Sequence, residues 1–289
     1  MNCLVLPANQ GALLVARDLL DAAVTATPGE GSPDEKAVHD FRVGIRRLRT
    51  WFRAFKKELS PAVTRRPRHQ LRSIVHATNL GRDAAVQLEW LARRRRVAAK
   101  DRPVVDRLAL ELQRKLRPTE PKSTRAIERF RTLAAALSAR LAAPPQSEPE
   151  ERSFGRVLGK RITRHAEKLR HAMRKVESAD DVTEAHKARI AAKRLRYLVE
   201  PAVRYSRHGK GLLRELKALQ NDLGALHDAH VFQRSPLLSR SARVNTIKAR
   251  LDDEVQRRYR RLRKRWSRKH MKKLDRRADA LASRLEHSK

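Results

Sequence analysis

The chain has 289 residues and a formal net charge of +36, from 68 lysines and arginines against 32 aspartates and glutamates. A surplus of this size repels itself and exceeds what solubility needs, so it indicates a polyanionic partner such as nucleic acid, an anionic membrane surface or a chain of phosphates. Hydrophobic residues make up 40% of the chain, which is enough for a packed core and excludes a disordered basic tail.

The composition favours an all-α fold. Ala, Leu, Arg and Glu dominate, and the chain has only ten glycines, so helix-forming residues prevail over sheet and turn formers. A single cysteine, Cys3, excludes an intrachain disulfide. No run approaches the ~18 apolar residues of a membrane span, and the N-terminus lacks a basic signal-peptide start. We therefore expect a cytoplasmic protein without a membrane partner.

Apolar periodicity and Pro/Gly punctuation predict nine helices in chain order. They cover about residues 9–26, 34–58, 66–97, 101–117, 124–142, 152–177, 182–205, 209–233 and 242–286. Pro201 predicts a kink or stop in the seventh. Residues 144–151 are Pro-rich and acidic, which is typical of a linker. We expect this linker to separate an N-terminal bundle (1–143) from a C-terminal bundle (152–289).

A basic stretch occurs twice. His39 to Arg49 and His186 to Arg196 share the pattern His-x-x-Arg-x-x-x-basic-Arg-Leu-Arg, and the copies start 186 − 39 = 147 residues apart. A second pair of landmarks, at Asp83 and Asp228, is 145 residues apart. Matching motifs at half the chain length predict a duplicated unit, with two helical bundles related by a pseudo-twofold axis.

Each copy places its cations in one stripe, because offsets 0, 3, 7, 10 and 14 fall within a narrow band of a helix. The first stripe is His39, Arg42, Arg46, Arg49 and Arg53, and the second is His186, Arg189, Lys193, Arg196 and Glu200. We expect the exceptional Glu200 to pair with a neighbouring arginine. The adjoining apolar face should pack inward; its residues are Phe41, Ile45, Leu48, Phe52 and Phe55, and then Ala188, Ala192, Leu195 and Val199.

Cations spaced ~5 Å along a helix repel each other, but they release counterions and form charge-assisted bonds when aligned with phosphates. A solvated surface is the ordinary explanation of one such stripe, and two matched copies favour a binding site instead. A third stripe, Arg161, Arg164, Lys168, His171 and Lys175, leaves both interpretations open. The basic runs 93–96 and 257–273 indicate outer surface, the latter with an apolar seam at Leu251, Val255, Leu262 and Trp266.

These motifs resemble the CHAD domain, the conserved-histidine α-helical domain. The resemblance lies in the two basic stretches and in residues 219–224 with His227 and Asp228, and it covers about residues 8–286. It implies two antiparallel four-helix bundles around a basic central groove or pore that binds inorganic polyphosphate, and for some members a location at polyphosphate granules.

Carried over to this sequence, the resemblance gives a set of candidate polyphosphate ligands. They are His39, Arg42, Arg46, Arg49, Arg53, Arg72, His186, Arg189, Lys193, Arg196 and Lys217. Further candidates are Arg161, Arg164, Lys168, Arg82, Lys210 and Arg214. Gly44, inside the first motif, costs helix stability by ~1 kcal/mol, and we expect it to permit the close approach of another helix.

Nucleic-acid binding is the main alternative function. Aromatic residues make up only 4% of the chain, so a base-stacking platform is not indicated, and no helix-turn-helix, zinc-finger or RNP signature is present. Helices that pack ~8–10 Å apart leave a groove for one extended phosphate chain but not for a duplex. We expect non-specific binding of nucleic acid by the outer arginines at low salt.

An enzyme is the other alternative. His227, Asp228 and His230 suggest a metal site, but Asp228 points to a different helix face and no third ligand is evident, so a structural role is favoured. No Gly-rich phosphate loop or activated nucleophile is recognisable. We expect a non-catalytic protein without metal or cofactor, in which His39 and His186 hydrogen-bond phosphate oxygens; a phosphohistidine role stays open.

Overall fold

The computed structural model describes residues 2–29, 35–79, 81–93, 101–116, 120–143, 151–204, 206–239 and 244–287. Within these ranges the regular elements are all helices, and the one β-type contact is an isolated bridge between Pro7 and Ser153. The predicted all-α class is confirmed.

The described part of the first half contains a short 3-10 helix and six α-helices. They are η1 (Cys3–Val5), α1 (Ala8–Thr25), α2 (Glu35–Ala54), α3 (Arg65–Ala77), α4 (Arg82–Arg93), α5 (Arg102–Leu116) and α6 (Glu120–Ala142). The second half contains α7 (Phe154–Arg174), α8 (Val182–Ala202), α9 (Gly209–Gln233), α10 (Pro236–Ser239), α11 (Asn245–Arg265) and α12 (Arg268–Glu286).

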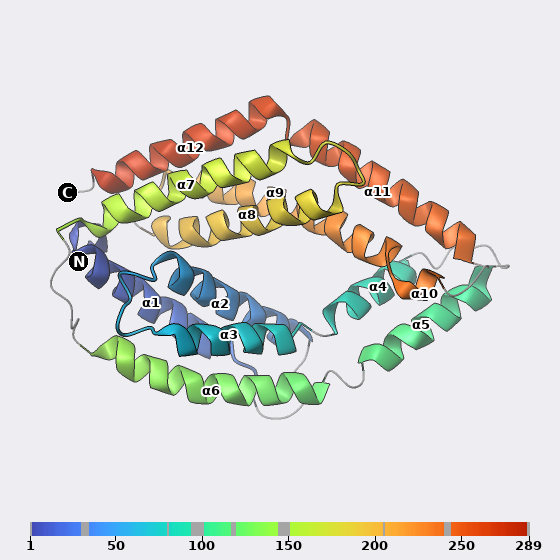
Figure 1. Ribbon diagram of the computed structural model, residues 1–289, viewed down its shortest axis with the longest axis horizontal. Helices are drawn as coiled ribbons and strands as arrows, with labels where there is room; N and C mark the ends of the chain where they lie inside the picture. Colours follow the sequence, from blue (N-terminus) through green and yellow to red (C-terminus); the bar gives the residue numbers. More distant parts are fainter. Residues whose placement is uncertain are drawn as a thin grey trace.

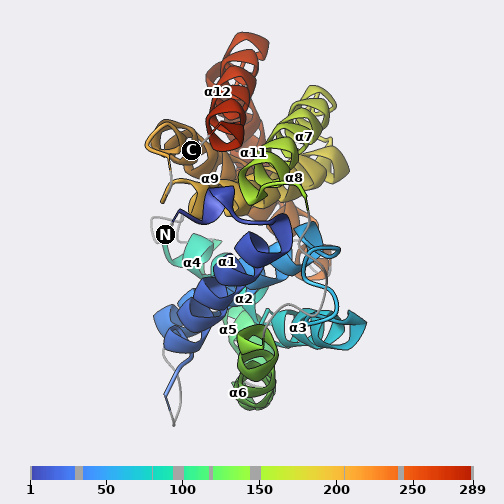
Figure 2. The same cartoon turned by 90° about the vertical axis from the view of Figure 1, so that its left-hand side faces the viewer.

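The helices form two packed groups and an extension at one end (Figure 1). Helices α1, α2, α3 and α6 contact one another, as do α7, α8, α9 and α12. Figure 2 shows the two groups one above the other, with the N-terminal segment between them. Contacts of α1 with α7 and of α2 with α8 join the groups, while α4, α5, α10 and α11 extend away from the chain ends.

One apolar core runs through both groups, including Phe41 and Phe130 from the first and Leu198 and Leu216 from the second. A smaller core joins the extension through residues such as Leu108 and Leu251. The predicted linker lies outside the described residues except for Glu151, so its role stays a prediction, as does the pseudo-twofold relation of two bundles.

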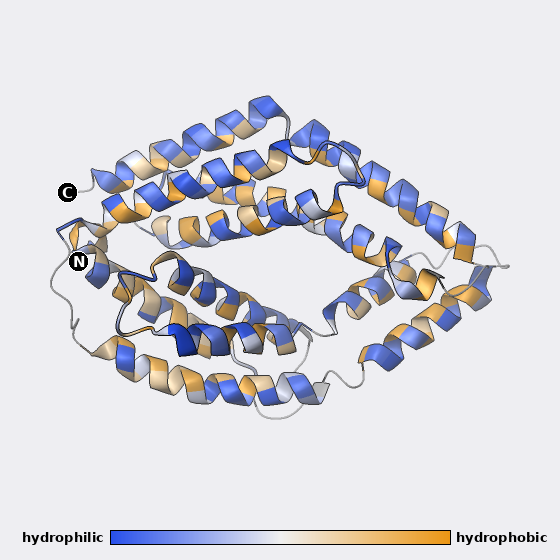
Figure 3. Cartoon of the chain, in the orientation of Figure 1, coloured by the Kyte–Doolittle hydropathy of each residue, from blue (hydrophilic) through white to orange (hydrophobic). Residues whose placement is uncertain are grey.

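The predicted inward faces of α2 and α8 are confirmed, because every apolar residue named for them is fully buried. Gly44 has the expected effect: a Cβ there would lie 3.1 Å from the Cα of Ala23, so α1 and α2 approach closely at this point. Figure 3 shows orange apolar residues mixed with blue hydrophilic ones along the helices, and α11 is largely blue. No helix of the described residues is long and apolar enough to cross a membrane.

The prediction of one helix over 66–97 is wrong, because α3 ends at Ala77 and α4 begins at Arg82. The hydroxyl of Thr78 donates to the carbonyls of Ile74 and Val75, which are the acceptors of the last turn. The Arg42 guanidinium donates to the Thr78 carbonyl at 3.0 Å. These local bonds end the helix where apolar periodicity alone predicts continuation.

The prediction of one helix over 242–286 is also wrong, because α11 ends at Arg265 and α12 begins at Arg268. Ser267 between them is an N-cap, whose hydroxyl accepts from the His270 amide at 3.3 Å. The indole of Trp266 donates to Asp222 at 2.8 Å and fixes the corner. The predicted stop at Pro201 is confirmed, since α8 ends one residue later.

The contact between α7 and α12 leaves no room at Gly155, where a Cβ would collide with the backbone carbonyl of Leu285. Backbone cannot move aside as a flexible side chain can, so we expect Gly155→Ala to lower the free energy of unfolding by about 2–3 kcal/mol. Urea unfolding measures this change. Gly29→Ala is the matched control, because nothing lies within 4 Å of a Cβ there; equal stability of the two variants would contradict the packing.

Candidate anion-binding groove

A groove of about 610 Å³ lies between helices of the two groups. Helices α2, α7 and α8 form most of its wall, and the α3–α4 connection closes one side. Its basic residues are Arg46, Arg49, Arg53, Arg82, Arg161, Arg164, Lys168, Arg189, Lys193 and Arg194. Against these ten lysines and arginines, Asp83 is the one carboxylate among the described lining residues, so the lining has a large surplus of basic side chains even though Arg161 pairs with Glu58.

Burial of the apolar faces turns the two repeated stripes toward the groove. On α2, Ile45 and Leu48 are fully buried, which places Arg46 and Arg49 on the groove side. On α8, buried Ala192 and Leu195 do the same for Arg189 and Lys193. Equivalent motif positions thus line the same groove.

The electrostatics of the groove are those of crowded cations. Burial, followed by Arg189, Arg46 and Arg82, lowers the pKa of Lys193 to about 6. Burial likewise lowers the pKa of Arg46 to about 10, with Arg82, Arg42 and Arg189 adding to the effect. A bound anion would reverse this repulsion, because an opposite charge favours the protonated forms.

Two predicted ligands have partners within the protein and lie outside the groove lining. Arg42 is 8% exposed and donates to the carbonyls of Thr78 and Val38 at 3.0 and 3.2 Å. Arg196 is 9% exposed, pairs with Glu200 at 3.2 Å and stacks over Tyr197. Both side chains therefore bond to the protein beside the groove and do not line the groove itself.

Ion pairs join the two groups of helices. The prediction that Glu200 pairs with an arginine is confirmed: Arg47 of α2 donates to it at 2.6 Å, from across the groups. Arg161 of α7 donates to Glu58 at 2.6 Å, and its guanidinium lies 4.1 Å from the ring centre of Phe55. The carboxylate of Glu58 is only 2% exposed, so this pair is held inside the protein.

The histidines have different environments. His186 lines the groove, and its ring centre is 4.9 Å from that of His227. Burial and then Arg189 lower the pKa of both, that of His227 to about 4. His39 is mostly exposed and outside the lining. Partial desolvation of its ring, followed by the charge of Arg42, lowers its pKa. In buried His230, Nε2 donates to the Ala179 carbonyl at 2.8 Å, so this ring nitrogen is held by the backbone. The described residues contain no group of three or more metal-ligand side chains.

The remaining candidates lie at or beyond the edge of the groove. Arg72 is exposed on α3, near enough to Arg49 to lower the pKa of Arg49, although burial is the larger cause. Lys210, Arg214 and Lys217 are exposed on α9, outside the lining. The other candidates line the groove: Arg46, Arg49, Arg53, Arg82, Arg161, Arg164, Lys168, His186, Arg189 and Lys193.

Sequence reasoning missed several lining residues, among them Arg194, His165 and Asn79. Arg194 lies inside the repeated motif, but it was not selected because the predicted stripe contained only residues at offsets 0, 3, 7, 10 and 14 from His186. Asn79 accepts a hydrogen bond from Arg46 and lines the groove because the chain breaks between α3 and α4. The only signal for Asn79 was its place two residues before Gly81, since Asn and Gly close together are typical of a helix break.

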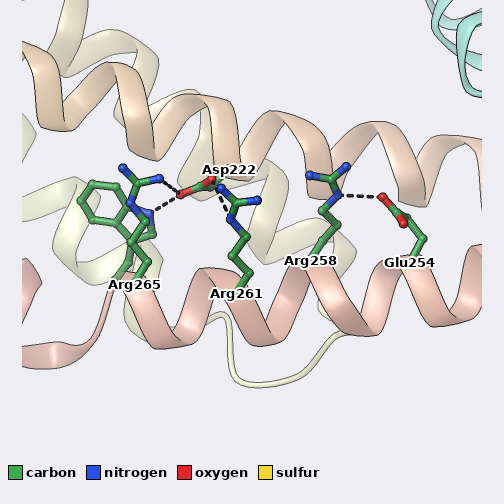
Figure 4. A network of polar contacts seen from close by, with 6 residues as sticks. Asp222, Glu254, Arg258, Arg261 and Arg265 are labelled. Atoms are coloured by element: carbon green, nitrogen blue, oxygen red, sulfur yellow. Dashed lines mark hydrogen bonds and ion pairs between the residues drawn. The ribbon is translucent and has the colours of Figure 1, made fainter. Parts of the chain in front are cut away.

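The outer arginines of α11 are partly compensated by carboxylates (Figure 4). Asp222 of α9 pairs with Arg265 at 3.2 Å and with Arg261 at 4.0 Å, and Glu254 accepts from Arg258 at 2.8 Å. The predicted apolar seam of this helix is buried. Of the other basic run, residues 94–96 lie outside the described residues.

Comparison with known proteins gives one family. The sequence model of the CHAD domain matches residues 15–235. Among solved structures, the crystal structure of the CHAD domain from the plant Ricinus communis is similar, with a TM-score of 0.56 and 23% sequence identity over 98% of this chain and 91% of that chain. No curated protein matches the chain. At this identity the likeness to the plant structure shows the fold alone.

The lowered pKa of Lys193 makes stability depend on pH. Between pH 7 and 9 the unfolded chain keeps this proton, whereas the folded chain releases it near pH 6. Because the unfolded state then binds more protons, the free energy of unfolding should rise with pH, by at most ~1.4 kcal/mol per unit. We expect Lys193→Met to flatten this slope in urea unfolding without ligand, and exposed Lys264→Met to leave it unchanged. An unaltered slope in Lys193→Met would contradict the burial of a charge at this position.

Proposed function

The chain belongs to the CHAD domain family, and from that premise we propose that its groove binds inorganic polyphosphate. The observation that carries the proposal is the groove itself, which ten lysines and arginines line together with one carboxylate among the described residues. Folding this charge together is unfavourable unless an anion neutralises it. Arg–phosphate bonds are charge-assisted and often bidentate, which suits a groove lined mainly by arginine.

The form of the groove favours a slender polyanion. Its walls are helices of two contacting groups, which leave width for one phosphate chain and not for a duplex. Tyr197 is the one Phe, Tyr or Trp among the described lining residues, and it is 4% exposed, so stacking of single-stranded bases has little support there. We propose a binding protein rather than an enzyme, located in the cytoplasm at polyphosphate granules.

A competition titration tests this function. Long-chain polyphosphate, duplex DNA and single-stranded RNA compete for the protein at equal phosphate concentration, at near-physiological and at higher salt. We expect polyphosphate to win and to lose less affinity as salt rises, because preformed bonds add to counterion release. Equal binding of DNA or RNA with the same salt slope would show that the charge acts only as a generic polycation.

The proposed groove also predicts at which positions the removal of a positive charge weakens polyphosphate binding. We expect Arg46→Gln with Lys193→Gln to weaken polyphosphate binding about 100-fold, since two charge-assisted bonds at ~1.5 kcal/mol each are lost. Isothermal titration at near-physiological salt measures the change.

The matched control removes the same charge from the exposed side of α11, as Arg260→Gln with Lys264→Gln. It should change the affinity only a few-fold, through weaker long-range attraction. An equal loss in the two double variants would mean that diffuse charge, and not the groove, holds the chain.

A further inference from the structure

A second pocket, of about 430 Å³, lies between α4, α9 and α11. Much of its wall is apolar or aromatic: Val86 and Trp90 come from α4, and Ala225, Ala229 and Phe232 from α9. The rings of Trp90 and Phe232 meet edge to face with centres 5.2 Å apart. A concave apolar pocket of this size suits a small organic ligand.

Two polar side chains in the pocket make no hydrogen bond or ion pair within the described residues. Gln87 is 6% exposed, and its amide makes no hydrogen bond to the part of the chain that the structure describes. Asp228 also lines the pocket and has no ion pair within 4.0 Å among the described residues. The Gln87 amide is not among the fully buried unpaired groups of the described residues, so a ligand that enters the pocket can reach this amide and form hydrogen bonds with it.

The remaining charges of the pocket are paired. Glu89 pairs with Arg93 one turn later on α4. Glu254 accepts from Arg258 at 2.8 Å on α11 (Figure 4). The polar groups left for a ligand are therefore an amide and a carboxylate set among apolar walls.

The pocket adjoins the end of the basic groove. On α4, pocket residues Val86 and Gln87 follow groove residues Arg82 and Asp83 by four positions, which is ~6 Å along the helix. From α8, the Nε of Arg189 lies 3.8 Å from the Cβ position of Gly224, one turn before Asp228. Both Arg82 and Arg189 act on the charge of Asp228.

We propose that this pocket holds the base of a nucleoside polyphosphate, whose phosphates enter the groove at Arg82 and Arg189. The inference rests on the proposed function, because it assigns the phosphates to the same groove. The apolar walls and Trp90 cover the faces of the base. The carboxylate of Asp228 and the amide oxygen of Gln87 accept from its exocyclic amino group, so adenine, cytosine and guanine bind in preference to uracil.

Three ligands with the same number of phosphates test the inference: adenosine tetraphosphate, uridine tetraphosphate and linear tetraphosphate. We expect the adenosine compound to bind about 10-fold tighter than the other two in isothermal titration, since it gains hydrogen bonds that they cannot make. Tryptophan fluorescence should change with the adenosine compound alone. It reports on Trp90, because Trp51 and Trp266 are 1% and 3% exposed in the core.

Gln87→Leu should abolish the adenosine advantage and leave linear tetraphosphate binding unchanged. Asp228→Leu, which also removes an acceptor, is the second variant, should the first fail to fold. Gln70→Leu is the matched control, because Gln70 lines another largely apolar pocket, between α3 and α6. It should keep the advantage. Equal affinities for the three ligands, or an advantage that survives both pocket variants, would overturn the inference and leave polyphosphate binding intact. If neither linear tetraphosphate nor long-chain polyphosphate bound, the result would contradict the proposed function itself.

Discussion

Repulsion among the groove cations is the constraint on which the rest of the structure depends. Ten lysines and arginines share one groove with a single carboxylate among its described lining residues. Burial, with repulsion from Arg189 and Arg46 as the next causes, lowers the pKa of Lys193 to about 6. Apolar burial on the opposite face of the same helices opposes this repulsion. Phe41 and Leu48 of α2 and Leu195 of α8 are fully buried, so separating the stripes would expose the core.

Ion pairs between the two groups of helices also oppose the repulsion among the groove cations. Glu200 receives Arg47 from the other group, and Glu58 holds Arg161. Each carboxylate lies outside the described lining of the groove. Glu58 pairs with one lining cation, Arg161. Glu200 pairs with Arg47 and Arg196 outside the lining, so the other lining cations remain for a polyanion. Breaking such a pair would leave a buried carboxylate uncompensated, which costs far more than an exposed pair is worth.

The helical periodicity of the sequence made most of the fold predictable, because each helix that carries a basic stripe also carries an apolar face that packs into the core. The breaks at Thr78 and Ser267 were missed, because they depend on side chains bonding to backbone groups that periodicity does not describe. The site was predictable where a stripe repeats. Arg42 and Arg196 belong to the stripes but bind within the protein. The partner of Arg42, the Thr78 carbonyl, comes from a distant segment and reaches it only in the folded chain. Arg196 pairs with Glu200 one turn later on the same helix, as the expected pairing of Glu200 with a neighbouring arginine allows.

The second repeated landmark gives the groove two different ends. Asp83 and Asp228 occupy matching places in the two halves of the sequence, and in the structure they meet near Arg82 and Arg189. Burial raises the pKa of Asp228, and Asp83 adds to the effect while the two arginines oppose it. A phosphate chain that reaches this end meets carboxylates as well as cations, so another phosphate gains less here than in the middle of the groove. A ligand group that donates hydrogen bonds gains more binding free energy at this end than a phosphate does, because carboxylates accept hydrogen bonds. This change of chemistry at one end, beside an apolar pocket, favours a chain capped by a base over a chain that simply continues.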